Sequence, residues 1–334
     1  MRILDDLNLF QSSPHPLFLG LGNFDGIHLG HRALLNEVVA DARKNSGIAS
    51  VLTFKEHPQQ VLHPNWRPQL LMSGGYKQLK FDELGIDLCF WLSFTLEFSK
   101  LSAENFIRDI LIEKLKVKKI YMGYNAFFGH NREGNAQTME GFSRRLGFSF
   151  KKIEPVKIGG EFVSSSRVRK LITEGNFEEA EACLGGPFRI FGKVVSGAGR
   201  GKALGFPTAN LKLDSGILPP FGVYPVRARV VTKTLNQETV GEQTLQSQFG
   251  QWNEGIMNFG LRPTFEQKGA STGAVPEVHL FSWQKDIEGA NLETMVYPRL
   301  RPEKKFAGEE ALKAQIHKDI RMAEAYFSGE PRAK

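Results

Sequence analysis

Cysteine is almost absent from this chain, and so is any long apolar run. Only Cys89 and Cys183 occur in 334 residues, far apart in the sequence, which excludes a disulfide scaffold and a cysteine zinc site. No stretch of about 18 consecutive apolar residues exists, so we expect no membrane partner. The first ten residues carry two aspartates where a secretory signal needs a basic region, and we therefore expect a cytoplasmic protein.

Positively charged residues are only in modest excess. The 43 lysines and arginines exceed the 36 aspartates and glutamates by enough to give a net charge of +7. The densest basic clusters, 114–119 and 301–305, are short and are better explained as solvated faces than as a phosphate track. No basic stripe with interleaved aromatic residues is visible, so we expect no nucleic-acid partner, whereas small anionic substrates fit the mild bias.

The remaining composition is that of a globular protein. Apolar residues make up 41% and charged residues 24%, which excludes a disordered chain, and the length suits two domains. Glycine is frequent (34), and 26 phenylalanines stand beside 6 tyrosines and 4 tryptophans, so they supply much of the core.

Hydrophobic periodicity divides the chain into two halves. In the first half, short apolar runs alternate with amphipathic helical patterns, which predicts a parallel α/β sheet. The expected strands cover 17–24, 48–54, 89–94 and 118–123, and the expected helices cover 31–45 and 102–115, the second with Ser102 as its N-cap. In the second half, short strand-like runs, the first at 188–195, are separated by Gly, Pro and polar stretches, which predicts an antiparallel barrel or sandwich. One helix at 308–327 closes it, and its buried face is expected to carry Leu312, Ile316, Ile320 and Ala323. The polar segment 232–255 is expected to form an extended hairpin loop with little core. We place the boundary at the turn 183–188, giving domains 1–185 and 186–330.

The most informative motif of the first half is GNFDGIHLGH, residues 22–31. Its glycines and its Asp-Gly turn bring the backbone close to whatever lies above the preceding strand. His28 and His31 are three residues apart where a helix begins, so both imidazoles are predicted to project from its first turn. Free N–H groups and the dipole favour anions there, so the motif predicts a phosphate site. A single histidine at such a point is more often structural.

Two other stretches carry candidate phosphate or metal groups. VSSSRVRKLI (163–172) places hydroxyls and arginines at a helix start, although an N-cap with surface arginines explains it too. In the stretch 197–211, Gly197 and Gly201 allow close approach to phosphates, but the spacing before Lys202 is too short for a P-loop. Thr208 and Asn210 follow and offer the oxygen ligands that Mg²⁺ prefers, with a plain turn as the alternative.

These motifs together resemble the bacterial bifunctional riboflavin kinase/FMN adenylyltransferase (FAD synthetase) family over nearly the whole chain. In the first half, GNFDGIHLGH, TFKEHP (53–58), GYNAFFGHNREGN (123–135) and VSSSRVR are similar to its motifs, with Glu56 where proline is usual and Ala126 where phenylalanine is usual. The resemblance implies a Rossmann-like nucleotidyltransferase domain. It also implies roles in binding ATP, its phosphates or the pyrophosphate for Gly22, Asn23, Phe24, Asp25, His28, His31, Asn125, Ser165, Ser166 and Arg169. Phe128 would line the flavin.

The second half resembles the riboflavin kinase part of the same family. GAGRGKALGFPTANL, FGVYPVRARV, MNFGLRPTF, PEVHLF and LRPEKKF are similar to its motifs. By this resemblance Glu277 is the general base, although a glutamate in an alternating strand is more often solvent-facing. Thr208 and Asn210 would hold Mg²⁺ with ATP, and Arg301 would contact the flavin. Gly197, Gly201, Lys202 and Thr208 would bind the nucleotide.

The resemblance therefore implies an enzyme that phosphorylates riboflavin to FMN in its C-terminal domain and adenylylates FMN to FAD in its N-terminal domain. Its substrates would be riboflavin, FMN and ATP, its cofactor Mg²⁺, and its state a monomer or a transient homo-oligomer. Two alternatives remain open: a riboflavin kinase alone, because Ala126 and Glu56 alter the first pocket, and a catalytically silent flavin- or nucleotide-binding regulator.

Overall fold

The computed structural model describes residues 1–63, 65, 69–197, 201, 204–213, 216–261, 274–283 and 287–329. Two compact units make up the chain. Unit 1 consists of Met1–Ser165 and Lys233–Ser247, and unit 2 consists of Ser166–Thr232 and Gln248–Lys334. The domain boundary expected after residue 185 stays a prediction, because these units follow packing and not activity.

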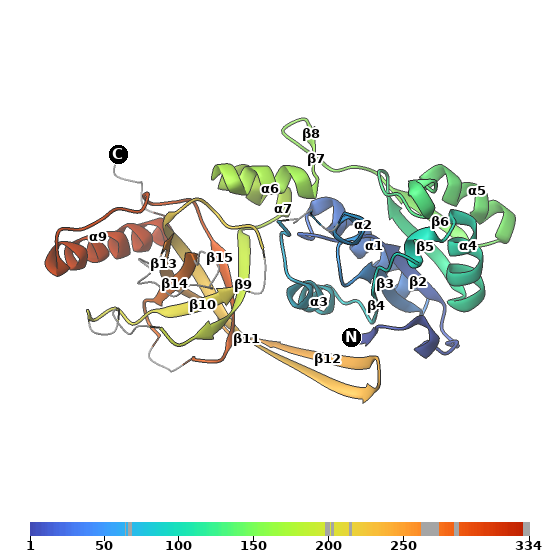
Figure 1. Cartoon of the computed structure of the whole chain (residues 1–334), viewed down its shortest axis with the longest axis horizontal. Helices are drawn as coiled ribbons and strands as arrows, with labels where there is room; N and C mark the ends of the chain where they lie inside the picture. The colour runs from blue at the N-terminus through green and yellow to red at the C-terminus, as the bar shows by residue number, and fades with distance from the viewer. Residues whose placement is uncertain are drawn as a thin grey trace. The chain divides into compact units, whose positions relative to one another are not determined.

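Unit 1 is built on a parallel sheet with the strand order β1-β4-β3-β2-β5-β6, and β12 pairs antiparallel with β1 at one edge (Figure 1). The strands of this sheet are β1 (Arg2–Leu4), β2 (Leu17–Leu21), β3 (Ile48–Phe54), β4 (Leu88–Leu92), β5 (Val117–Gly123), β6 (Ser149–Ile153) and β12 (Glu242–Phe249). A separate hairpin joins β7 (Lys157–Ile158) to β8 (Glu161–Phe162). The predicted α/β class of the first half is confirmed.

Helices connect the strands and cover both faces of this sheet. They are η1 (Leu7–Leu9), α1 (Leu29–Lys44), α2 (Pro58–Leu62), α3 (Gly74–Glu83), η2 (Phe98–Lys100), α4 (Ala103–Asn105), the π-type helix η3 (Phe106–Lys114), η4 (His130–Arg132) and α5 (Ala136–Leu146). The Ser102 hydroxyl caps α4 as the sequence predicts, by accepting a hydrogen bond from the Asn105 N–H at 3.1 Å. Gly20 lets α1 approach β2 closely, since a Cβ there would lie 2.8 Å from Leu34 Cδ2.

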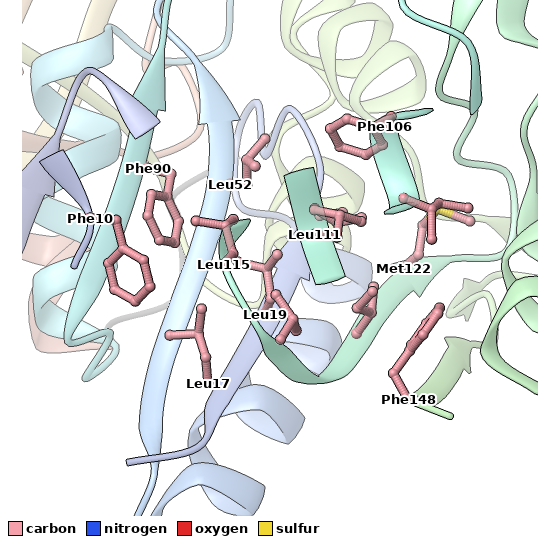
Figure 2. Close-up of a cluster of buried hydrophobic side chains, with 14 of the residues drawn as sticks. Phe10, Leu17, Leu19, Leu52, Phe90, Phe106, Leu111, Leu115, Met122 and Phe148 are labelled. Carbon is pink, nitrogen blue, oxygen red and sulfur yellow. The ribbon is translucent and has the colours of Figure 1, made fainter. Parts of the chain in front are cut away.

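The core on the other face of the sheet lies between the strands and helix η3. Figure 2 shows Leu17 and Leu19 of β2 beside Leu111 and Leu115 of the helical segment. Side chains alternate along a strand, so the leucines at odd positions of β2 face η3 while Gly20 faces α1. The strand is therefore apolar throughout, as expected for a parallel strand covered on both faces.

Unit 2 is an antiparallel barrel that closes on itself. The strand order is β13-β14-β10-β9-β15-β11, and β11 also pairs with β13. The strands are β9 (Phe188–Val195), β10 (Ala209–Leu213), β11 (Gly222–Thr239), β13 (Asn253–Leu261), β14 (Ala274–Leu280) and β15 (Asn291–Val296). The unit also contains α6 (Ser165–Glu174), α7 (Phe177–Leu184) and α9 (Glu309–Ser328). The predicted barrel with a closing helix is confirmed.

Helix α9 differs from the sequence prediction on its packed face. Ala323 is fully buried against Val223 and Ile256, and Ile316 and Ile320 are half-buried beside them. Asp319 is also buried, which an apolar stripe does not predict, because its carboxylate pairs with an arginine described below. In the part of the chain that the structure describes, no helix combines the length and the apolar character needed to cross a bilayer.

The polar segment 232–255 forms a hairpin, as expected, but it is integrated into a sheet. Strand β11 runs to Thr239, the chain turns at Val240 and Gly241, and β12 returns. Residues Glu242–Thr244 of β12 pair with β1 in unit 1. Leu245 is fully buried, so this hairpin has more core than its composition suggests.

Candidate active sites

A cavity of about 650 Å³ lies at the carboxyl ends of β2, β3 and β5 in unit 1. The strand order reverses here, because β3 lies on one side of β2 and β5 on the other. The loops that leave β2 and β5 diverge at such a point and open a crevice. Four predicted site residues line this cavity, and they come from two distant motifs: Gly22, Asn23, Asn125 and Phe128.

Phenylalanine dominates the wall of this cavity. Phe54 meets Phe94 edge-to-face with ring centroids 5.0 Å apart, and Phe98 lies 5.4 Å from Phe54. Six phenylalanines line it in all: Phe54, Phe94, Phe98, Phe106, Phe127 and Phe128. Part of the unusual phenylalanine content therefore forms a ligand-sized apolar cavity and not only core. A flat aromatic ligand matches such walls.

The polar lining of the cavity also includes groups that the sequence did not single out. His57, His63, His130 and Arg132 join Asn23 and Asn125 there. The Arg132 guanidinium lies 4.4 Å from the centre of the Phe127 ring, and 49% of Phe127 remains exposed. The cavity thus combines an aromatic interior with cationic and imidazole groups that suit an anion.

Phe128 is held by the backbone of its own loop. Its N–H donates to the Gly134 carbonyl at 3.0 Å, and the Gly134 N–H donates back at 2.9 Å. Gly134 has to be glycine here, since a Cβ would lie 2.6 Å from the Phe128 ring. Ala126 also lines the cavity, and its small side chain occupies little of this space.

The two signature histidines pack against each other at the start of α1. His28 is the N-cap, and its Nδ1 accepts a hydrogen bond from the His31 N–H at 3.4 Å. The two imidazoles stack with centroids 3.8 Å apart and ring planes 14° from parallel. Only 5% of His28 is exposed, and of the described residues these two are not among those lining the large cavity. The sequence suggested that both rings project freely from the helix. In the structure they instead pack against each other.

His31 has the electrostatics of a neutral imidazole. Burial lowers its pKa well below 6.5, and the neighbouring His28 and Lys77 lower it further. Its Nδ1 is buried without a hydrogen-bond partner among the described residues. An unsatisfied buried nitrogen is costly, so this atom is well suited to accept or donate a bond to a ligand.

The turn between β2 and α1 is unusual in its backbone. Phe24, Gly26 and Ile27 have φ values of 52°, 86° and 39°. Such conformations persist where surrounding contacts hold them, and they concentrate at functional sites. Phe24 is fully buried against His31 and Phe81, so this predicted site residue forms part of the core.

Asp25 fixes the turn and its surroundings. Its carboxylate accepts hydrogen bonds from the Leu71 N–H at 2.9 Å and from the Met72 N–H at 3.3 Å. Its carbonyl accepts one from the Ser165 hydroxyl at 2.9 Å. The structure thus brings Ser165 to the first motif, but it directs the Asp25 carboxylate to the backbone of another loop.

The other predicted groups of the serine motif lie on α6 in unit 2. Ser166 and Arg169 occupy its first two turns. The neighbouring Arg167 forms an ion pair with Glu179 of α7. Arg167 therefore braces two helices, whereas Arg169 is the guanidinium that the sequence assigned to phosphate.

In unit 2, polar side chains from three strands form one row. Asn210 of β10 lies directly opposite Glu277 of β14, and Glu277 lies opposite Asn258 of β13. Directly opposed residues of antiparallel strands share a face of the sheet. Asn210 is buried, Glu277 half-buried and Asn258 exposed. Two predicted site residues thus meet, and Asn258 is a neighbour that sequence reasoning did not single out.

The glycines of the 197–211 stretch contact the predicted metal ligands. A Cβ at Gly197 would lie 2.0 Å from Asn210 Nδ2, and one at Gly201 would lie 2.9 Å from Thr208 Oγ1. The Phe206 N–H donates to the Gly201 carbonyl at 2.8 Å and closes the loop. Lys202, which the sequence assigned to the nucleotide, lies outside the described residues.

His279 supports this loop and was also missed from sequence. Its Nδ1 lies 2.8 Å from the Pro207 carbonyl oxygen, directly before Thr208. Its ring meets Phe206 edge-to-face at 5.9 Å. The signal was available, since residues two apart in a strand share a face and His279 follows Glu277 at that spacing.

Arg301 forms an ion pair within unit 2. Its guanidinium donates to both carboxylate oxygens of Asp319 on α9, with a closest distance of 2.7 Å. The pair is bidentate, which is the strong geometry for arginine and carboxylate. Its predicted contact with flavin remains a prediction beside this structural role.

Among the described residues, a metal ion would need ligands other than a cluster of His, Cys, Asp or Glu side chains. The described ranges contain no group of three or more His, Cys, Asp or Glu side chains able to hold one. Thr208 and Asn210 supply a hydroxyl and an amide oxygen close together, which suits a hard cation that also binds nucleotide phosphates.

Comparison with known proteins gives the family. A family model described as FAD synthetase matches residues 10–167, and one described as riboflavin kinase matches residues 184–327. The bifunctional riboflavin kinase/FMN adenylyltransferase of Escherichia coli (strain K12) is 33% identical over 320 residues, which is 96% of each chain. This chain belongs to the bifunctional riboflavin kinase/FMN adenylyltransferase family.

Another curated member agrees with this assignment, and one solved structure shares the fold. The bifunctional riboflavin kinase/FMN adenylyltransferase of Listeria monocytogenes is 33% identical over 313 residues, covering 93% of this chain and 92% of its own. A crystal structure from Streptococcus pneumoniae, named as a macrolide-efflux protein, matches with a TM-score of 0.78 and 27% identity over 96% of this chain and 98% of that one. The predicted family is confirmed, and both of its domains occur in the expected order.

Proposed function

We propose that this chain makes FAD in two ATP-dependent steps. Residues 186–330 phosphorylate riboflavin to FMN, and residues 1–185 transfer the adenylyl group of ATP to FMN with release of pyrophosphate. The observation that carries the proposal is that both family domains are matched in one chain, each over a unit that contains a built polar site. The alternatives of a single activity or of a silent regulator leave one or both sites without use.

In the kinase site, Glu277 accepts the proton of the ribityl 5′-hydroxyl. The oxygen bonds to the γ-phosphorus of ATP, the bond from that phosphorus to the bridging oxygen breaks, and ADP leaves. Asn210, opposite Glu277, and Thr208 hold the nucleotide with its metal ion. Gly197 and Gly201 lie against these two side chains. We propose that both glycines and Lys202 bind the phosphates of the nucleotide.

A divalent metal accompanies ATP in both kinds of domain, and we propose Mg²⁺. Thr208 and Asn210 suit it, because Mg²⁺ prefers oxygen ligands and keeps phosphates and water around it. When bound, it neutralises charge on the phosphates. Every other contribution in the site comes from protein groups that align the substrates.

In the adenylyltransferase site, an oxygen of the FMN phosphate attacks the α-phosphorus of ATP and pyrophosphate leaves. This displacement needs no protein nucleophile, since alignment and charge neutralisation carry it. His28 and His31 contact the ATP phosphates. The His31 Nδ1 is the atom best suited to do so, because it has no hydrogen-bond partner among the described residues. Gly22, Asn23 and Asn125 position the nucleotide, and Ser165, Ser166 and Arg169 neutralise the leaving pyrophosphate.

The phenylalanine-lined cavity is the proposed flavin site of unit 1. Its aromatic wall suits the isoalloxazine ring, with Phe128 fixed in place by Gly134. Arg301 would contact the flavin of the kinase site, in addition to its pairing with Asp319. Phe24 and Asp25, which shape the turn, remain the other proposed nucleotide-binding residues of this site.

The remaining expectations belong to the same proposal. The enzyme acts in the cytoplasm as a monomer or a transient homo-oligomer, on riboflavin, FMN and ATP and without nucleic acid. The scattered basic residues and the buried Cys89 and Cys183, which form no disulfide with each other, support this setting. Light scattering of the purified chain tests the oligomeric state.

Product analysis tests the two activities together. The purified chain is incubated with riboflavin, ATP and Mg²⁺, and FMN and FAD are resolved by chromatography. Formation of both supports the proposal, FMN alone indicates a riboflavin kinase, and neither product indicates a regulator. A His28→Ala or His31→Ala protein should then accumulate FMN, and variants that form FAD at the unaltered rate would show that the first site is misassigned.

A further inference from the structure

Lys77 is a buried cation beside the first motif that no role above uses. It lies in the second turn of α3, and 9% of the residue is exposed. Its ammonium group donates to the Asn23 carbonyl at 2.8 Å and lies 5.1 Å from the centre of the Trp91 ring. A buried ammonium is costly to desolvate, so a site that contains one gains little stability from its charge alone.

The bond from Lys77 acts on the strained turn. Asn23 opens that turn, and its carbonyl also accepts a weaker bond from the Thr53 hydroxyl at 3.4 Å. Phe24, Gly26 and Ile27 follow with positive φ. A backbone in this conformation holds its shape only while neighbouring groups constrain it.

Hydrogen bonds in two opposite directions connect the turn to the segment that includes α3. The Asp25 carboxylate reaches out to the Leu71 and Met72 N–H groups, which precede the helix. Lys77 reaches back from the helix to Asn23. The turn is therefore held by hydrogen bonds at Asn23 and at Asp25. His28 and His31 follow directly after it in the chain.

We propose that Lys77 is a positioning residue of the adenylyltransferase site, whose ammonium group fixes the Asn23 carbonyl and thereby the turn that presents His28 and His31 to ATP. This inference rests on the proposed function of unit 1. It assigns the transfer site a cation outside all of its sequence motifs, which acts through the backbone and not by contact with the reacting atoms.

The charge of Lys77 also acts on its surroundings. Burial lowers its pKa to about 8, against the raising effects of Asp25 and Cys89. Burial raises the pKa of the Cys89 thiol to about 12, so this neighbour stays neutral at physiological pH. Lys77 in turn lowers the pKa of His31, in the same direction as His28 does. A protonated Lys77 thus adds to the effects of burial and of His28, which keep the His31 ring neutral, while it holds the turn.

Three variants separate this role from a packing role. Lys77→Met keeps the length of the side chain but removes the donor and the charge, and Lys77→Arg restores both. Lys80→Met is the matched control, because Lys80 lies on the same helix, is equally buried and pairs with Glu83 instead of the turn. Adenylylation of FMN is measured at saturating and limiting ATP, and phosphorylation of riboflavin by the same preparations reports on the integrity of the chain.

The expected result is a drop of about tenfold or more in kcat for FAD formation by Lys77→Met, as for loss of one bond to a charged group. The KM for FMN should stay nearly unchanged, since the phenylalanine cavity is untouched. Lys77→Arg should recover most of the rate, and its activity should extend to higher pH than that of the wild type because arginine does not deprotonate. Lys80→Met should form FAD at close to the wild-type rate.

Other outcomes would overturn the inference. If the wild type forms FAD and Lys77→Met forms it at the same kcat, Lys77 does not position the turn. If Lys77→Met does not fold, the Lys77→Arg variant provides the test. An arginine variant that folds but loses FAD formation at the same high pH as the wild type argues against the role. A wild type that forms no FAD would instead refute the proposed function itself.

Discussion

Asn210 and Glu277 lie directly opposite each other on the antiparallel strands β10 and β14. The two residues are distant in the sequence, and each belongs to a different motif. Their common face of the sheet brings a proposed metal ligand next to a proposed base, so a substrate hydroxyl near Glu277 is also near the nucleotide held by Asn210. Asn258 extends the row on the other side of Glu277.

Replacing Glu277 tests the base directly. A Glu277→Gln protein should lose about a hundredfold or more in riboflavin phosphorylation, because the amide cannot accept the proton. Adenylylation of added FMN should be unaffected. Glu254→Gln is the matched control, since this β13 glutamate pairs with Arg227 on the barrel. Equal phosphorylation rates for the Glu277 variant and the wild type would remove Glu277 from the mechanism.

Adding a single methyl group at Gly197 should disturb the kinase site. A Cβ there would lie 2.0 Å from the Asn210 amide nitrogen, so Gly197→Ala has to displace that side chain or the loop. A shift of this size should lower kcat/KM for riboflavin phosphorylation by about tenfold to a hundredfold. Gly308→Ala is the control, because a Cβ at Gly308 meets nothing within 4 Å. A fully active Gly197→Ala protein would show that the Asn210 position is not critical.

The stability of unit 1 should fall on acidification because of His31. Its folded pKa is lowered by burial, then by His28 and Lys77, so the folded state stays neutral while the unfolded chain binds a proton below about pH 6.5. The free energy of unfolding therefore decreases as the pH drops below that value. His31→Gln should lose less stability than the wild type between pH 7 and pH 5, as measured by urea unfolding. A His63→Gln control, at an exposed position, should retain the wild-type pH dependence.

Asp319 should be essential to the stability of unit 2. It is 1% exposed and holds the Arg301 guanidinium in a bidentate pair. Asp319→Asn should lower the free energy of unfolding by about 3 kcal/mol, because it leaves the arginine half-paired in a mostly buried position. Glu309→Gln on the same helix, whose partner Lys313 is partly exposed, should change it by less than about 1 kcal/mol. Similar stabilities for the two variants would contradict this structural role of Arg301.

Local patterns identified most of the elements. The strands expected at 48–54 and 188–195 occur as β3 and β9 with the same bounds. Their apolar runs end at glycine, proline or charged residues, and such local signals determine where a strand can begin and end. The Ser102 cap and the closing helix of the barrel followed from local signals in the same way.

Local sequence patterns could not identify the side-chain contacts within the two sites. Nothing in the sequence near Asp25 indicates that its carboxylate binds the backbone at Leu71, or that Lys77 binds Asn23. The stacking of His28 on His31 depends on the twist of the turn before α1, which neighbouring segments impose. The apolar pattern of the closing helix does not predict that Asp319 is buried, because its partner Arg301 precedes the helix in an irregular segment.

The sequence by itself determined the family, the order of the two domains, the sheet type of each half and the motif residues from which both sites are built. Those properties depend on residue type and spacing along the chain, which the sequence contains in full. Only the tertiary structure decided that the phenylalanines form a cavity at the reversal of strand order, and that Glu277 faces Asn210. It also decided that a lysine of α3 holds the first motif, because burial and pairing arise only when distant segments share the same space.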